Sequence, residues 1–126
     1  ELKYLLGIDV PVIASCNRVS ERDGHFVSVG VELSRETTVD EVGELMKIPT
    51  LGIPSSPEFV NKIIDDSPTR QEHLWNGNGM TTTVGNIRVE GNIVRYDALS
   101  HNTVRGAAGG VILLAEFAVQ ESYITK

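Results

Sequence analysis

The sequence has one cysteine, no cluster of Lys or Arg, and no long run of apolar residues. One cysteine cannot form an internal disulfide, which favours a reducing, cytoplasmic environment. Nucleic acids and anionic membranes are held by clustered positive charge, whereas this chain has a formal net charge of -6, so neither partner is expected. No apolar stretch approaches the roughly 20 residues needed to cross a bilayer.

What is present is a chain of 126 residues, of which 40% are hydrophobic and 22% charged, enough for one ordinary core. The chain begins at Glu1 without an initiator methionine and passes almost directly into strand-like sequence. We therefore expect it to be a piece of a longer protein.

Alternation of apolar and polar residues predicts several strands. Residues 10–19 (VPVIASCNRV) and 25–33 are strand-like, and the polar segment SERDG between them predicts a hairpin. A second hairpin is predicted within residues 80–100, on either side of Gly91 and Asn92. From Pro49 to Gly79 the sequence is rich in loop residues, and only FVNKII (59–64) resembles a strand.

Two segments have helical periodicity. Thr38 and Glu41 have the spacing of a capping box, and the apolar stripe that follows predicts a short amphipathic helix over 39–47. A second helix is predicted over 103–120, with Asn102 as its N-cap.

Three glycines, Gly106, Gly109 and Gly110, lie inside the second predicted helix. Each weakens a helix by up to about 1 kcal/mol relative to alanine, so a close contact must compensate for it. Either another part of the chain packs tightly there, or a ligand lies against the helix start, where free N–H groups favour an anion or a polar amide. The glycine spacing matches no nucleotide-binding loop and leaves both interpretations open.

Few side chains suggest chemistry. Cys16 lies in an apolar strand-like segment and is expected to be a small buried side chain rather than a nucleophile. His25, after a glycine turn, is either structural or a carrier of protons near neutral pH. Arg18 is either a solvated charge or a planar partner for a carboxylate or phosphate. His73 and His101 lack neighbours at metal-binding spacing, so no metal site is predicted.

Three segments resemble one enzyme family. The segment CNRVSERDGH, with Arg18 seven positions before His25, is similar to the part of archaeal and fungal aspartate-β-semialdehyde dehydrogenases that supplies the substrate-binding arginine and the acid/base histidine. HNTVRGAAGGVILLAE resembles the C-terminal helix of that family, and GMTTTVGNIRV resembles the strand before it. The likeness extends from Val10 to the end of the chain.

The resemblance implies an NADP-dependent oxidoreductase that converts L-aspartyl-4-phosphate to aspartate semialdehyde and phosphate through a thioester, in lysine, threonine and methionine biosynthesis. It implies that His25 carries the proton and that Arg18 holds the carboxylate of the acidic substrate. Asn102, Thr103 and Gly106 would border the nicotinamide of NADP. Cys16 matches a non-catalytic cysteine of the family. The nucleophilic cysteine is expected upstream, so the 126 residues alone are expected to be inactive.

The fold expected from the resemblance is α+β, with a mixed, largely antiparallel sheet covered by helices. It would resemble the C-terminal domain of glyceraldehyde-3-phosphate-dehydrogenase-like enzymes, without the N-terminal dinucleotide-binding domain. Residues 1–101 would form part of the substrate-binding and dimerisation domain. Residues 102–126 would form the C-terminal helix that returns to the nucleotide-binding domain. A homodimer or homotetramer is the expected assembly.

The sequence departs from the family pattern in two places. Phe26-Val27 stands where Thr-Glu is common, and Ser20 where proline is common. Malonyl-CoA reductases share the HNTVRGAAGG segment, so a malonyl-CoA or succinyl-CoA reductase is an alternative. A stand-alone interaction module without chemistry is a second one.

Overall fold

The computed structural model describes residues 4, 5, 7, 9–13 and 19–124. Cys16 and Arg18, to which specific roles were assigned above, lie outside the described residues.

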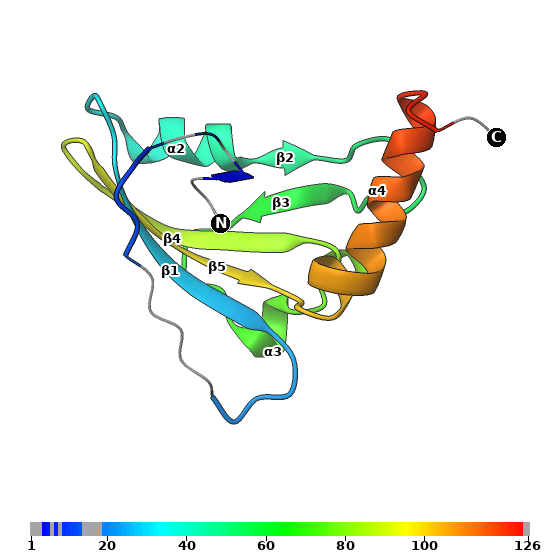
Figure 1. Ribbon diagram of the computed structural model, residues 1–126. Coiled ribbons are helices and arrows are strands. Elements are labelled where there is room, and N and C mark those ends of the chain that lie inside the picture. The colour runs from blue at the N-terminus through cyan, green and yellow to red at the C-terminus, as the bar shows by residue number, and fades with distance from the viewer. Residues whose placement is uncertain (1–3, 6, 8, 14–18, 125–126) are drawn as a thin grey trace.

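The described part of the chain forms one five-stranded sheet (Figure 1). Its order is β1 (His25–Glu32), β5 (Ile93–Ser100), β4 (Thr82–Glu90), β3 (Phe59–Ile63) and β2 (Ile48–Pro49). Neighbouring strands are antiparallel except β3 and β4, which run parallel. The prediction of a mixed, largely antiparallel sheet is confirmed.

The hairpin predicted around Gly91 and Asn92 is also confirmed. β4 and β5 pair so that Glu90 lies opposite Ile93, which leaves a two-residue turn between them. Gly91 has a φ of 61°, the left-handed conformation that such a turn requires and that glycine adopts without steric cost.

The other predicted hairpin is wrong for the part of it that the structure describes. β1 pairs with β5, with His25 opposite Ser100, while residues 9–13 and Val19 belong to no strand. Pro11 has no N–H to donate to a ladder, and Val10 and Val12 are exposed. Alternation in residues 25–33 predicted a strand correctly, but alternation does not specify which strand lies beside it.

Helices cover both faces of the sheet. α2 (Val39–Met46) starts at Thr38, whose side chain accepts a hydrogen bond of 3.2 Å from the N–H of Glu41, so the predicted capping interaction is confirmed. Gly43 of α2 lies against Ile63 on one face. The segment predicted to be loop contains α3 (Arg70–His73) and η1 (Asn76–Gly79), and Leu74 between them is buried beneath the opposite face. Figure 1 shows α2 and α3 on opposite sides of the sheet.

The last predicted helix exists, but it begins with a wide turn. In η2 (Val104–Ala108) the N–H of Gly106 bonds to the carbonyl of His101 at 3.1 Å, a five-residue step, and α4 (Gly109–Gln120) continues from there. The prediction of Asn102 as N-cap is wrong. Thr103 is the residue before the first helical one, and the Asn102 side chain accepts a hydrogen bond from Gly24 instead.

A small apolar cluster of Ile53, Met80 and Leu113 attaches α4 to the rest of the molecule. A Cβ added at Gly109 would lie 2.4 Å from Sδ of Met80, so this glycine permits the close packing. Among the helices in the described ranges, none is both long and apolar enough to cross a membrane.

Candidate functional site

One cavity, of about 310 Å³, brings together three of the residues predicted to act in a site: His25, Asn102 and Gly106. Its floor is one face of the sheet. Because side chains alternate along a strand, the register places His25 and Val27 of β1 on the same face as Ser100 and Ala98 of β5. Thr82 of β4 completes the floor. The wall is formed by the loop from β5 to η2, which carries Asn102, and by η2 itself, which carries Gly106.

Gly106 leaves this cavity open. The nearest contact of a Cβ added there would be the carbonyl oxygen of His101, at 3.9 Å, so no packing contact requires a glycine. At Gly110, by contrast, a Cβ would lie 2.4 Å from the carbonyl oxygen of Arg105. Each of the two interpretations of the glycines, close packing and ligand binding, therefore applies to different positions. Gly109 and Gly110 permit close packing, whereas Gly106 faces space that a ligand can occupy.

The amide of Asn102 has a defined orientation. Its Oδ1 accepts a hydrogen bond of 2.8 Å from the N–H of Gly24. No described residue accepts a hydrogen bond from its Nδ2, so Asn102 offers a donor to the cavity. Such a donor suits a carbonyl, carboxamide or phosphate oxygen.

His25 is exposed at the start of β1, and its ring makes no hydrogen bond to any described residue. It lines the first cavity and also a second one of about 600 Å³, which Asp23, Gly24 and Arg70 line as well. An accessible imidazole that no described residue engages can take or give a proton to a ligand in either hollow.

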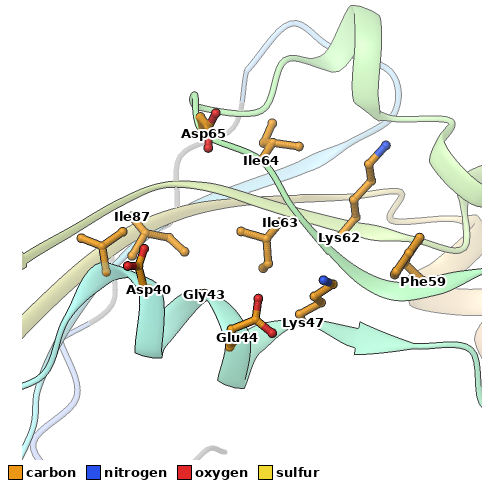
Figure 2. A pocket seen from close by; sticks show the side chains of 11 residues that line it. Asp40, Gly43, Glu44, Lys47, Phe59, Lys62, Ile63, Ile64, Asp65 and Ile87 are labelled. Atoms are coloured by element: carbon orange, nitrogen blue, oxygen red, sulfur yellow. The ribbon is translucent and has the colours of Figure 1, made fainter.

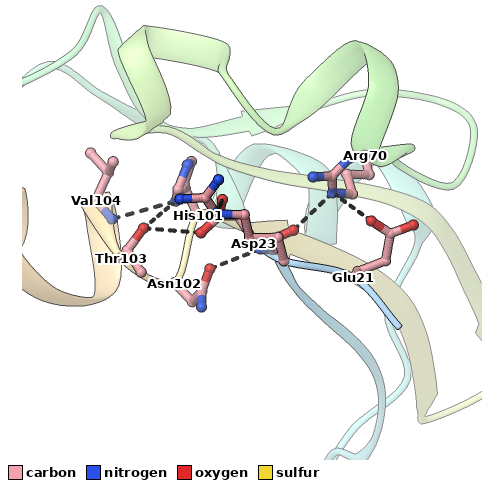
Figure 3. Close-up of polar contacts among 9 residues, drawn as sticks. Glu21, Asp23, Arg70, His101, Asn102, Thr103 and Val104 are labelled. Carbon is pink, nitrogen blue, oxygen red and sulfur yellow. Dashed lines mark hydrogen bonds and ion pairs between the residues drawn. The ribbon is translucent and has the colours of Figure 1, made fainter. Parts of the chain in front are cut away.

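Thr103 does not line the cavity with the other predicted residues. Its hydroxyl lies 3.4 Å from Oδ1 of Asp23 and 3.2 Å from Nδ1 of His101 (Figure 3). Thr103 therefore connects the loop before η2 to the turn before His25, a structural contact that its sequence position did not indicate.

His101 is a buried support beneath that loop, with 2% of its surface exposed. Its ring meets Trp75 edge to face, with centroids 4.5 Å apart, and its Nδ1 accepts a hydrogen bond of 3.4 Å from the N–H of Val104. Its Nε2 has no hydrogen-bond partner among the described residues. The described residues contain no group of three potential metal ligands.

A further cavity, of about 500 Å³, lies between α2 and the sheet (Figure 2). Ile63 and Ile87 line it among charged side chains of both signs, which are Asp40, Glu44, Lys47, Lys62 and Asp65. With mixed charge and none of the predicted site residues, this hollow has no evident preference for a ligand.

Comparison with known proteins gives one consistent relationship. No protein-family model matches the chain. An aspartate-semialdehyde dehydrogenase of Archaeoglobus fulgidus is 44% identical over 121 residues, which is 92% of this chain and 35% of that protein. A malonyl-CoA reductase (NADP) of Metallosphaera sedula is 34% identical over 128 residues, 94% of this chain and 36% of that protein.

The fold agrees with this relationship. The crystal structure of aspartate-semialdehyde dehydrogenase with NADP from Candida albicans matches with a TM-score of 0.63 and 27% identity. The match covers 81% of this chain and 31% of that one. In sequence and in fold, the chain is therefore similar to aspartate-semialdehyde dehydrogenases, and in sequence also to a malonyl-CoA reductase. It spans about a third of the length of the relatives it matches.

Proposed function

We propose that this chain is the C-terminal, substrate-binding portion of an NADPH-dependent aspartate-semialdehyde dehydrogenase. The whole enzyme would reduce L-aspartyl-4-phosphate to aspartate semialdehyde and phosphate, in the cytoplasm, on the route to lysine, threonine and methionine. The observation that carries the proposal is the shared cavity of His25, Asn102 and Gly106, which come from two segments far apart in sequence. Homology to several aspartate-semialdehyde dehydrogenases supports it.

The lining of the cavity fits a nicotinamide. Val27 and Ala98 offer apolar surface to a flat ring, Asn102 offers a donor to a carboxamide oxygen, and Gly106 has no side chain in the way. When bound, NADPH supplies the hydride of the reaction. Thr103, predicted to border the cofactor, would act by holding the loop that carries Asn102.

His25 would hold and transfer the proton of the reaction at an imidazole nitrogen, because its ring is exposed to the cavity and not engaged elsewhere among the described residues. Arg18 would bind the substrate carboxylate, a match of guanidinium and carboxylate that rests on the sequence motif alone. The nucleophilic cysteine would come from polypeptide outside these 126 residues, so the chain alone would be inactive.

The surface of α4 supports the proposed division at residue 102. Val111 is 68% exposed and Leu114 is 66% exposed, and a helix with apolar residues around its circumference is normally covered on all sides. A groove of about 650 Å³ is lined by residues of η2 and α4 between Arg105 and Phe117, and by Leu51. We propose that residues 102–126 pack against the nucleotide-binding domain, and that residues 1–101 belong to the substrate-binding and dimerisation domain.

The exposure of Phe26 on β1, 50% of the residue, is consistent with burial of this strand in a homodimer or homotetramer.

The malonyl-CoA reductase among the relatives gives a second candidate. Its 34% identity extends over 94% of this chain, so reduction of an acyl-CoA by the same NADP-dependent chemistry is the alternative function. The two candidates differ in the leaving group, which is phosphate in one and coenzyme A thiolate in the other.

The deciding experiment compares substrates on the full-length gene product that carries this sequence. We expect NADP reduction with aspartate semialdehyde that depends on phosphate, and no NADPH oxidation with malonyl-CoA. The opposite preference would establish the alternative, and no activity with either would favour a non-catalytic module. The isolated 126 residues serve as the matched control. Turnover by these residues alone would contradict the proposal that the nucleophilic cysteine lies outside them.

A further inference from the structure

The peptide unit between Asp23 and Gly24, immediately before His25, is held at both of its polar groups (Figure 3). The carbonyl oxygen of Asp23 accepts a hydrogen bond of 2.8 Å from Nε of Arg70. The N–H of Gly24 donates one of 2.8 Å to Asn102. A peptide unit is planar and rigid, so bonds at its two opposite edges fix the orientation of the whole plane.

This orientation decides how the chain enters β1. Gly24 has a φ of +117°, a conformation that side-chain-bearing residues rarely adopt. The next residue, His25, pairs opposite Ser100 and is the first residue of the strand. A rotation of the Asp23–Gly24 plane would therefore move the backbone that carries the imidazole. No described residue forms a hydrogen bond with the ring that would resist this motion.

Arg70 is itself held in place. It is the first residue of α3, and its Nε also lies 3.2 Å from Oε2 of Glu21, so one guanidinium joins both ends of the turn. The bond to the Asp23 carbonyl comes from a charged donor, which makes it stronger than one between neutral groups. A second contact, 3.4 Å between the hydroxyl of Thr103 and Oδ1 of Asp23, supports the same turn from the side of η2.

We propose that Arg70 is a positioning residue for His25. It would act through the Asp23 carbonyl, without touching the substrate, and it would keep the imidazole aimed at the reacting group. This inference rests on the proposed function, because it assigns the turn a role in proton transfer. Asn102 would link the same turn to the cofactor, since its Oδ1 accepts a hydrogen bond from Gly24 and the residue lines the cavity.

The test compares Arg70→Gln with Arg22→Gln in the full-length gene product. Arg22→Gln is the matched control, because it removes the same charge from the same turn. The Arg22 side chain is 93% exposed, and its one ion pair with a described residue, 3.9 Å from Nε to Oδ2 of Asp23, is long. We expect Arg70→Gln to lower kcat by about tenfold or more and to change KM by less than about twofold, because misplacement of a catalytic group slows chemistry more than binding. Arg22→Gln should leave both values within about twofold.

A second readout does not need activity. With ¹³C-labelled histidine, the imidazole resonances of His25 should shift in Arg70→Gln and stay unchanged in Arg22→Gln. Equal kinetics or unshifted resonances in the two variants would overturn the proposal. So would failure of Arg70→Gln to fold, because the residue would then be structural. If the wild-type protein proves inactive, the proposed function fails, and the resonances alone decide whether Arg70 orients His25.

Discussion

The backbone N–H of Gly24 donates a 2.8 Å hydrogen bond to Oδ1 of Asn102, 78 positions further along the chain. The bond joins the turn before His25, which lines the cavity, to the loop before η2, which carries Asn102. It also determines which end of the Asn102 amide faces a ligand, because only Nδ2 is left to donate. Asn102 therefore has two roles that substitutions can separate.

Asn102→Asp keeps an acceptor for Gly24 but removes the donor to the cavity, whereas Asn102→Ala removes both. We expect Asn102→Asp to raise KM for NADPH by about tenfold, the value of one hydrogen bond of about 1.4 kcal/mol. Its free energy of unfolding should change by less than about 0.5 kcal/mol. Asn102→Ala should raise KM similarly and also lose about 1 kcal/mol of stability, because Gly24 loses its partner. Steady-state kinetics and urea unfolding measure both effects, and identical behaviour of the two variants would contradict the division of roles.

The glycines of the last helix give a matched pair of alanine substitutions. Gly106→Ala should stabilise the protein by up to about 1 kcal/mol, because alanine favours a helix and nothing obstructs its Cβ. The same methyl group would fill part of the cavity and weaken NADPH binding. Gly110→Ala should destabilise the protein by about 1–3 kcal/mol, since its Cβ would lie 2.4 Å from the carbonyl oxygen of Arg105.

Urea unfolding and NADPH titration of both glycine variants test this pair. A Gly106→Ala protein that is more stable but still binds NADPH normally would show that the cofactor does not lie against η2.

His25→Asn should reduce kcat by about 10²–10⁴-fold, the usual contribution of general acid–base catalysis. Stability should stay within about 0.5 kcal/mol of wild type, because no described residue hydrogen-bonds to the ring. His73→Asn is the control. His73 Nδ1 accepts a hydrogen bond of 2.9 Å from the N–H of Thr69, the residue before its own short helix, and His73 lines neither cavity. Its turnover should be unchanged, and wild-type turnover in His25→Asn would remove the role assigned to His25.

Local signals in the sequence predicted local structure well. The contact between Thr38 and the N–H of Glu41 spans three residues, and the turn at Gly91 spans two, so neighbouring residue types are sufficient to specify each. The pairing of β1 with β5 was not predicted, because alternation defines the faces of a strand and leaves its neighbours open. Asn102 has a side chain that favours capping, yet the long-range bond to Gly24 replaced that local role.

For the site too, residues in recognisable motifs were predicted and a residue with a long-range contact was not. His25, Asn102 and Gly106 were predicted from motifs, and the structure places them around one cavity although no periodicity in the sequence relates them. Arg70 was missed, because its contact with Asp23 spans 47 positions and nothing in its local sequence indicates such a partner. The segment around it was predicted to be loop, since a helix as short as α3 has too few residues for helical periodicity to appear.

Glu41 gives a prediction for acidic solution. Its carboxylate accepts hydrogen bonds from both terminal guanidinium nitrogens of Arg35 and one of 2.7 Å from the hydroxyl of Thr37. The bond to Arg35, followed by that to Thr37, lowers the pKa of Glu41 from 4.5 to about 2. Because the folded pKa is depressed, the stability that this carboxylate contributes is fully present above its unfolded pKa of 4.5 and is lost as pH falls through about 2.

NMR titration of the Glu41 carboxyl carbon should give a midpoint of about 2 in the wild type and a midpoint closer to 4.5 in Arg35→Gln. The free energy of unfolding of Arg35→Gln should fall less steeply between these pH values than that of the wild type, because its Glu41 binds protons in the folded and unfolded states at more similar pH. Arg22→Gln removes an arginine that makes no contact with Glu41 and should leave the midpoint where it is. A wild-type midpoint near 4.5 would mean that the Arg35–Glu41 pair does not persist in solution.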